Sequence, residues 1–105
     1  MRRRYIAVEI DSDRTFNEKE FRNAIWSNIL RLFGEVGASQ TDFTLIDYNQ
    51  TKSQAILRCS HKALELVKAV IVSVTEIEEE LATVHILQIS GTLKALRRRV
   101  PIFSR

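Results

Sequence analysis

The feature of this sequence that most constrains its fold is the spacing of its apolar residues. Along the chain this spacing changes between the two-residue period of a strand and the longer period of an amphipathic helix. Residues alternate from Tyr5 to Ile10, which places Ile6, Val8 and Ile10 on one face and polar or small residues on the other. A chain that buries only every second side chain is a strand with one face against a core. We therefore predict a first strand over residues 5–10.

A helix is predicted to follow this strand. Thr15 and Glu18 have the spacing of a capping box, in which a hydroxyl and a carboxylate satisfy the first free amides of a helix. Gly34 stands where a left-handed cap would end it. Between these points the apolar residues recur at helical spacing, with Trp26 beside them: Phe21, Ile25, Ile29, Leu32 and Phe33.

Two β-rich segments come next, Phe43–Tyr48 and Ala55–Cys59, with the polar stretch 49–53 in the connection between them. A connection of this length predicts an antiparallel hairpin. Ser60 then has the right chemistry to cap a second helix, whose apolar stripe ends near Thr75.

The last predicted strand covers Thr83–Ile89, and it follows an acidic, turn-like run, Glu76–Glu80. The order strand, helix, strand, strand, helix, strand predicts an α+β fold of the ferredoxin-like or RNA-recognition-motif-like split βαβ type. In this fold a four-stranded antiparallel sheet carries both helices on one face and leaves the other face open for a partner. We expect one domain over residues 1–105 with basic terminal segments, 1–4 and 94–105, and Pro101 argues against a helix that runs unbroken to the end.

Basic residues gather at both ends of the chain, in clusters without acids. They account for eight of the sixteen lysines and arginines, whereas residues 5–93 carry more acidic than basic side chains. Clustered arginines concentrate a positive field and form paired hydrogen bonds to phosphate, so RNA or DNA is the expected partner, and plain solubility is the alternative. We expect the clusters to emerge at opposite ends of the sheet and to contact separate stretches of backbone. Their members are Arg2, Arg3, Arg4, Lys94, Arg97, Arg98, Arg99 and Arg105.

The sequence offers little support for catalysis or for a metal site in this chain. Cys59, His61 and His85 lack the spacing of zinc ligands, and adjacent carboxylates such as Glu78 and Glu79 point in different directions. A single cysteine excludes an internal disulfide and fits a reducing compartment. No apolar run approaches the roughly 20 residues needed to span a bilayer, so we expect a cytoplasmic protein without membrane contact.

The mode of RNA binding is constrained by the third strand, residues 55–59, which has no aromatic side chain. Bases cannot stack there, so phosphate contacts and shape should dominate. Ser90 and Thr92 beside Gly91 end the last strand in a turn, and we expect them also to bind RNA, because exposed amides and hydroxyls there would make a phosphate-binding concavity. The two roles are compatible.

A face for a partner protein is also predicted, on apolar and aromatic side chains of the sheet. Tyr5, Tyr48 and Ile56 are the candidates, and the alternative is that they complete the core.

Several short segments agree in order and spacing with a known family over nearly the whole chain. They are Arg4-Tyr5-Ile6, Ile25-Trp26, Leu32-Phe33-Gly34-Glu35-Val36-Gly37-Ala38, Ile56-Leu57-Arg58-Cys59 and Ile89-Ser90-Gly91-Thr92-Leu93. On these residues the chain resembles archaeal ribonuclease P protein component 2. The resemblance implies an auxiliary subunit of the endoribonuclease that removes the 5′ leader from precursor tRNA, in which the RNA subunit catalyses hydrolysis with Mg²⁺ and this chain binds no cofactor.

The same resemblance implies several partners: ribonuclease P RNA, the TIM-barrel-like protein component 3, the other protein subunits and, through the holoenzyme, precursor tRNA. A homodimer within a heterotetramer stays open. Two other functions also stay open at this point. One is a protein-interaction module with incidental RNA contact. The other is a small-molecule regulatory domain of the same topology, although Asp11–Arg14 stand where such a domain carries a glycine-rich loop.

Overall fold

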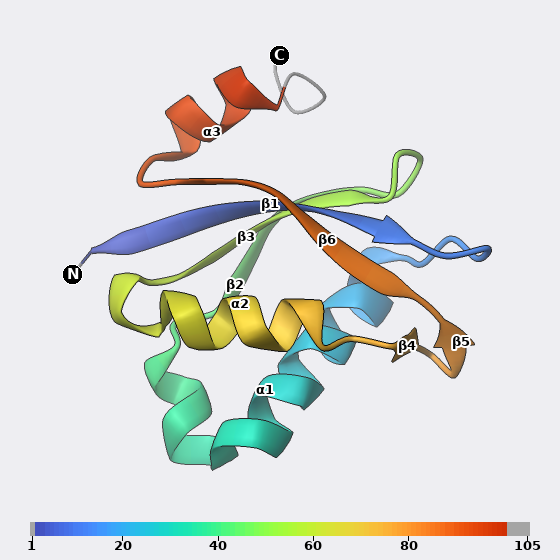
Figure 1. Ribbon diagram of the computed structural model, residues 1–105, viewed down its shortest axis with the longest axis horizontal. Coiled ribbons are helices and arrows are strands. Elements are labelled where there is room, and N and C mark those ends of the chain that lie inside the picture. The colour runs from blue at the N-terminus through green and yellow to red at the C-terminus, as the bar shows by residue number, and fades with distance from the viewer. Residues whose placement is uncertain (1, 101–105) are drawn as a thin grey trace.

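The structure is a computed structural model that describes residues 2–100, and it confirms the predicted α+β fold (Figure 1). A short 3₁₀ turn, His61–Ala63, leads into the second helix. The elements follow in the order β1 (Arg3–Asp11), α1 (Glu18–Gln40), β2 (Thr44–Asn49), β3 (Gln54–Ser60), α2 (Leu64–Val72), β4 (Glu76–Ile77), β5 (Glu80–Leu81), β6 (Thr83–Ser90) and α3 (Leu93–Arg99).

The main sheet has the strand order β2-β3-β1-β6, with every neighbouring pair antiparallel. Figure 1 shows α1 and α2 on one face of this sheet and α3 on the other. Ile6, Val8 and Ile10 of β1 point to the α1–α2 side, as the alternation predicts, and belong to the main core. The strand period thus decides which side chains the two long helices cover.

The opposite face of the sheet is not fully open, because α3 packs on it. Leu96 and Val100 form a second, smaller core there with Ala7 and Ile56. The prediction of an open face is therefore wrong over this region. Leu93, Leu96 and Val100 recur at helical spacing, and this short stripe is what makes the basic segment a helix that docks on the sheet.

Helix α1 begins two residues later than predicted. Asn17, not Thr15, is the N-cap: its Oδ1 accepts a hydrogen bond from the Glu20 amide at 2.8 Å, and Glu20 Oε1 accepts one from the Asn17 amide at 3.0 Å. Phe16 is buried, so the chain is still anchored in the core just before the helix can begin. The capping box exists, shifted by two positions.

Gly34 breaks α1 but does not end it. Its φ of 71° and ψ of 175° interrupt the helical path, which then resumes to Gln40. Few residues other than glycine adopt a positive φ at low cost, so the glycine marks a kink between two helical segments.

Three further elements agree with the predictions in kind. The hairpin of β2 and β3 is confirmed, and Ser60 accepts a hydrogen bond from the Ala63 amide at 3.3 Å as the predicted cap of the second helical segment. The acidic run is a tight hairpin, in which Glu78 and Glu79 take positive φ values between β4 and β5. Among residues 2–100, no helix is long and apolar enough to cross a membrane.

Candidate nucleic-acid interface

The first arginine cluster lies beside the start of α3, the helix that carries the second cluster. Tyr5 near the start of β1 pairs with Ser90 at the end of β6, because the two strands are antiparallel neighbours. The expectation that the clusters emerge at opposite ends is therefore wrong. Antiparallel pairing places the first residues of one strand beside the last residues of the other, so the N-terminal arginines lie next to the start of α3. Arg105 and Pro101 lie outside the described residues.

Arg3 and Arg4 of the first cluster belong to β1, and Arg2 directly precedes the strand. Arg3 Nε donates to Asp42 Oδ2 at 2.9 Å, and the Arg4 guanidinium donates to the Arg3 carbonyl at 3.0 Å. With Arg2, Tyr5 and Gly91, these arginines line an open hollow of about 440 Å³. Gly91 belongs to the turn that precedes α3, so the hollow extends from the first cluster to the start of the helix that carries the second.

The second cluster lies on α3, and its members differ in exposure. Lys94, Arg98 and Arg99 are exposed, whereas Arg97 is half-buried and its guanidinium lies 3.3 Å from Asp47 Oδ2 on β2. Arg97 thereby ties α3 across the sheet to the far edge strand. Of its four basic residues that the structure describes, three present their charges to solvent.

Ser90 and Thr92 both serve the start of α3. The Thr92 hydroxyl accepts a hydrogen bond from the Ala95 amide at 3.2 Å, and the Ser90 hydroxyl accepts one from the Thr92 amide at 3.3 Å. Their side chains thus form the turn and the helix cap, which is the simpler of the two interpretations of this segment.

The three predicted partner residues do not form one surface. Tyr48 stacks on Phe21 on the α1 side of the sheet, with ring centroids 5.6 Å apart, and its hydroxyl donates to the Phe16 carbonyl. Burial, followed by the nearby charge of Glu20, raises the Tyr48 pKa. Ile56 is 0% exposed beneath α3, and Tyr5 is half-buried against the same small core. Ile56 therefore completes a core and is covered in this conformation.

Two further basic residues lie at this end of the molecule and were not predicted from the sequence. Lys62 is exposed and lines a hollow of about 390 Å³ together with Arg2. Arg58 lies opposite Tyr5 in β3, donates to Thr44 Oγ1 at 3.3 Å, and has a buried Nε without a hydrogen-bond partner in the described part of the chain. The pairing of β1 with β3 brings these two residues close to the arginines. The sequence alone does not reveal this proximity, because it does not specify the strand register.

Cys59 is buried in the main core, and its chemistry is that of a packing residue. Burial raises its pKa from 9.0 to about 11, with a further increase from Asp42 and an opposing effect from Arg4. The thiol is therefore protonated and poorly nucleophilic near neutral pH. Within residues 2–100, no three His, Cys, Asp or Glu side chains are grouped closely enough to hold a metal ion.

Comparison with known proteins places this chain in a family. The family model described as Rpp14/Pop5 matches residues 4–101. The chain is similar to ribonuclease P protein component 2 of Pyrococcus furiosus, with 34% identity over 93% of this chain and 82% of the relative. The chain is also similar to ribonuclease P protein component 2 of Methanosarcina mazei, with 29% identity over 89% of this chain and 78% of the relative.

A solved structure resembles the fold as well. A chain in the cryo-EM structure of yeast ribonuclease MRP matches with a TM-score of 0.74 and 17% identity, over 96% of this chain and 86% of that one. At this identity the likeness is one of fold.

Proposed function

The chain belongs to the Rpp14/Pop5 family and is a protein subunit of ribonuclease P, and from that premise we propose how it supports the enzyme. The observation that carries the proposal is the family match over residues 4–101. The match includes Arg4 and the basic residues of α3, whereas Arg2, Arg3 and Arg105 lie outside it. The enzyme is the archaeal ribonucleoprotein that removes the 5′ leader from precursor tRNA.

We propose that the merged basic end of the sheet binds the phosphate backbone of ribonuclease P RNA. Arg2, Arg4, Lys94, Arg98 and Arg99 would supply the charge, on β1, the residue before it, and the helix that follows β6. Neutralising phosphates lowers the repulsion that opposes compact RNA folding and releases counterions. Arg3 and Arg97 are each paired with an aspartate and contribute chiefly by holding this surface in shape.

Under this proposal the RNA performs the hydrolysis with Mg²⁺ bound at its own catalytic domain. This chain holds no cofactor and contributes no reacting group. Its effect is to let the RNA reach the active fold at a lower Mg²⁺ concentration, because protein cations replace part of the counterion cloud.

Protein partners would engage the helical side of the molecule. The groove between α1 and the start of α2 has a volume of about 700 Å³ and includes Leu32 and Leu66, each 51% exposed. Exposed apolar side chains beside a groove fit a protein interface. We propose ribonuclease P protein component 3 as the partner on this side, within a cytoplasmic holoenzyme that contains the other subunits, with a homodimer as the centre of a heterotetramer.

Reconstituted cleavage of precursor tRNA at limiting Mg²⁺ tests the function. Adding this chain to the RNA and the remaining subunits should raise the cleavage rate, and replacing Arg2, Arg4, Arg98 and Arg99 with alanine should remove most of that gain. High Mg²⁺ should restore the variant, since the ion then replaces the lost protein charge. Lys52→Ala, in the β2–β3 loop at the other end of the sheet, is the matched control. Equal rates with and without the chain would refute the proposal.

A further inference from the structure

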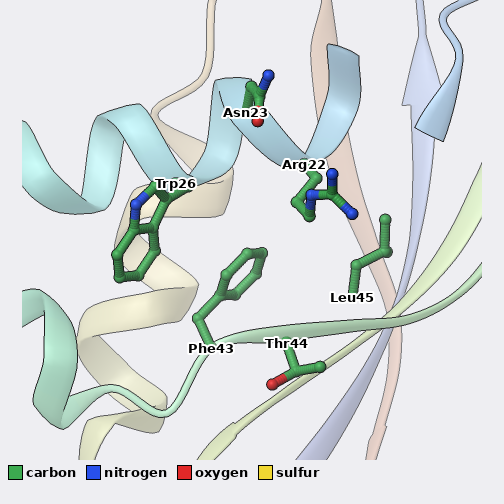
Figure 2. A pocket seen from close by; sticks show the side chains of 6 residues that line it. All are labelled: Arg22, Asn23, Trp26, Phe43, Thr44 and Leu45. Atoms are coloured by element: carbon green, nitrogen blue, oxygen red, sulfur yellow. The ribbon is translucent and has the colours of Figure 1, made fainter. Parts of the chain in front are cut away.

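The pocket between α1 and β2 combines two aromatic rings with an unpaired cation. Trp26 and Phe43 are stacked with centroids 6.2 Å apart and an interplanar angle of 16°, and both are half-buried. Arg22 lines the same pocket, is exposed, and makes no hydrogen bond or ion pair within residues 2–100. Figure 2 shows the Phe43 ring between Trp26 and Arg22, in the space where α1 passes over the edge strand.

The pocket adjoins the basic end of the sheet through two contacts. Asp42, which pairs with Arg3 at 2.9 Å, directly precedes Phe43 in the chain. Thr44, which lines the pocket, accepts a hydrogen bond from Arg58 at 3.3 Å. A nucleic-acid backbone on the arginines of β1 would thus run within reach of the pocket.

From these observations we propose that the Arg22–Trp26–Phe43 pocket binds an unpaired nucleobase of the RNA whose phosphates contact the arginine clusters. This inference rests on the proposed function and adds a second kind of contact to it. Unstacked RNA bases are recognised by stacking on aromatic rings and on guanidinium planes. The pocket has a volume of about 300 Å³, at the small end of ligand sites, which suits one planar base.

The aromatic-free third strand does not conflict with this site. The sheet face lacks a stacking platform at β3, and α3 covers part of that face. The stacking groups lie instead at the edge of the sheet, beside β2. A peptide that adds a strand to β2 is less favoured as the occupant, because β2 carries a bulge between Leu45 and Asp47, and bulges protect edge strands from further pairing.

Trp26 is the only tryptophan of the chain, so its fluorescence reports on this pocket alone. The full chain is titrated with a short single-stranded adenosine oligoribonucleotide and with an abasic strand of equal charge. Fluorescence anisotropy of a label on each strand follows binding. We expect both strands to bind and only the base-bearing strand to quench Trp26.

Variants sharpen the test. Phe43→Leu keeps an apolar group in place, and Arg22→Gln removes the cation. Each should weaken the base-bearing strand roughly tenfold and leave the abasic strand nearly unchanged. Arg31→Gln, an exposed arginine on the same helix, is the matched control for charge and should weaken neither strand selectively.

Four results would overturn the inference. Binding of the base-bearing strand without quenching, or equal quenching by the abasic strand, would show that no base stacks here while phosphate binding stands. Quenching by protein component 3 but not by RNA would assign the pocket to a protein interface. If neither strand binds at all, the proposed RNA-binding function fails together with this inference.

Discussion

At the scale of single residues, Arg97 shows how position in the fold changes the role of a charged side chain. It belongs to an arginine cluster by sequence, yet its guanidinium is half-buried against Asp47. We predict that Arg97→Ala lowers the free energy of unfolding by about 1 kcal/mol, since a partly buried ion pair is lost. Arg98→Ala, which removes an exposed neighbour, should change it by less than about 0.5 kcal/mol in the same chemical denaturation experiment. Equal effects would contradict the structural role of Arg97.

Cys59 gives the folding stability a specific dependence on pH. Its pKa is raised from 9.0 to about 11 in the folded chain. Below pH 9 both states hold the proton, whereas between pH 9 and 11 only the unfolded state releases it. The unfolded state is thus favoured progressively as the pH rises through this window, and its advantage is constant above it.

The measurement is the difference in the free energy of unfolding between the wild-type chain and Cys59→Ala at several pH values. Other groups that titrate in the same range contribute equally to both proteins, so their contributions to the free energy of unfolding cancel in this difference. It should be constant up to pH 9 and should then shift against the wild type by up to roughly 3 kcal/mol as the pH approaches 11. A difference that stays constant from pH 8 to 11 would mean that the thiol ionises normally.

Residue roles could be predicted from the sequence only where they do not depend on pairing. The arginine clusters are visible as composition, and most of their side chains prove to be exposed. The sequence does not distinguish the roles of Arg58 and Ile56, which lie two residues apart on β3. Their surroundings are formed by the strands on either side and by α3.

At the scale of elements, α3 covers part of the sheet face that α1 and α2 leave free, and forms a small core there. Leu96 is 0% exposed and packs with Ile56 and Ala7. We predict that Leu96→Ala costs about 3 kcal/mol of unfolding free energy, from lost burial and a residual cavity. Val36→Ala on α1, where the side chain is 75% exposed, should cost less than about 0.5 kcal/mol. A cost for Leu96→Ala no larger than this control would mean that α3 does not dock on the sheet.

The long elements of the fold were predictable, and the short ones were not. β1, α1 and the β2–β3 hairpin each repeat their apolar period several times, which fixes both type and face. α3 spans seven residues and presents only a brief stripe, and β4 and β5 have two residues each, so local periodicity is too short to reveal them. The start of α1 was misplaced because two capping boxes overlap and the burial of Phe16 decides between them.

At the scale of the whole molecule, antiparallel pairing of β1 with β6 brings the start of β1 beside the end of β6 and the start of α3. Basic segments separated by most of the sequence thereby become neighbours on one side of the sheet. The acidic β4–β5 hairpin follows α2 and leads into the start of β6, so it lies toward the opposite end of that strand (Figure 1). The small net charge of +3 is therefore polarised along the molecule, which favours one orientation on a polyanion.

The most direct test of the central claim, that both clusters form one phosphate-binding surface, is the salt dependence of binding to ribonuclease P RNA. The slope of log affinity against log salt is measured for the wild type and for two variants, Arg2→Ala with Arg4→Ala and Arg98→Ala with Arg99→Ala. Each pair should flatten the slope by roughly 1.4 to 1.8, at about 0.7 to 0.9 per lost phosphate contact, and the two changes should add. Lys52→Ala should leave the slope unchanged. A wild-type slope retained in either double variant would contradict the claim.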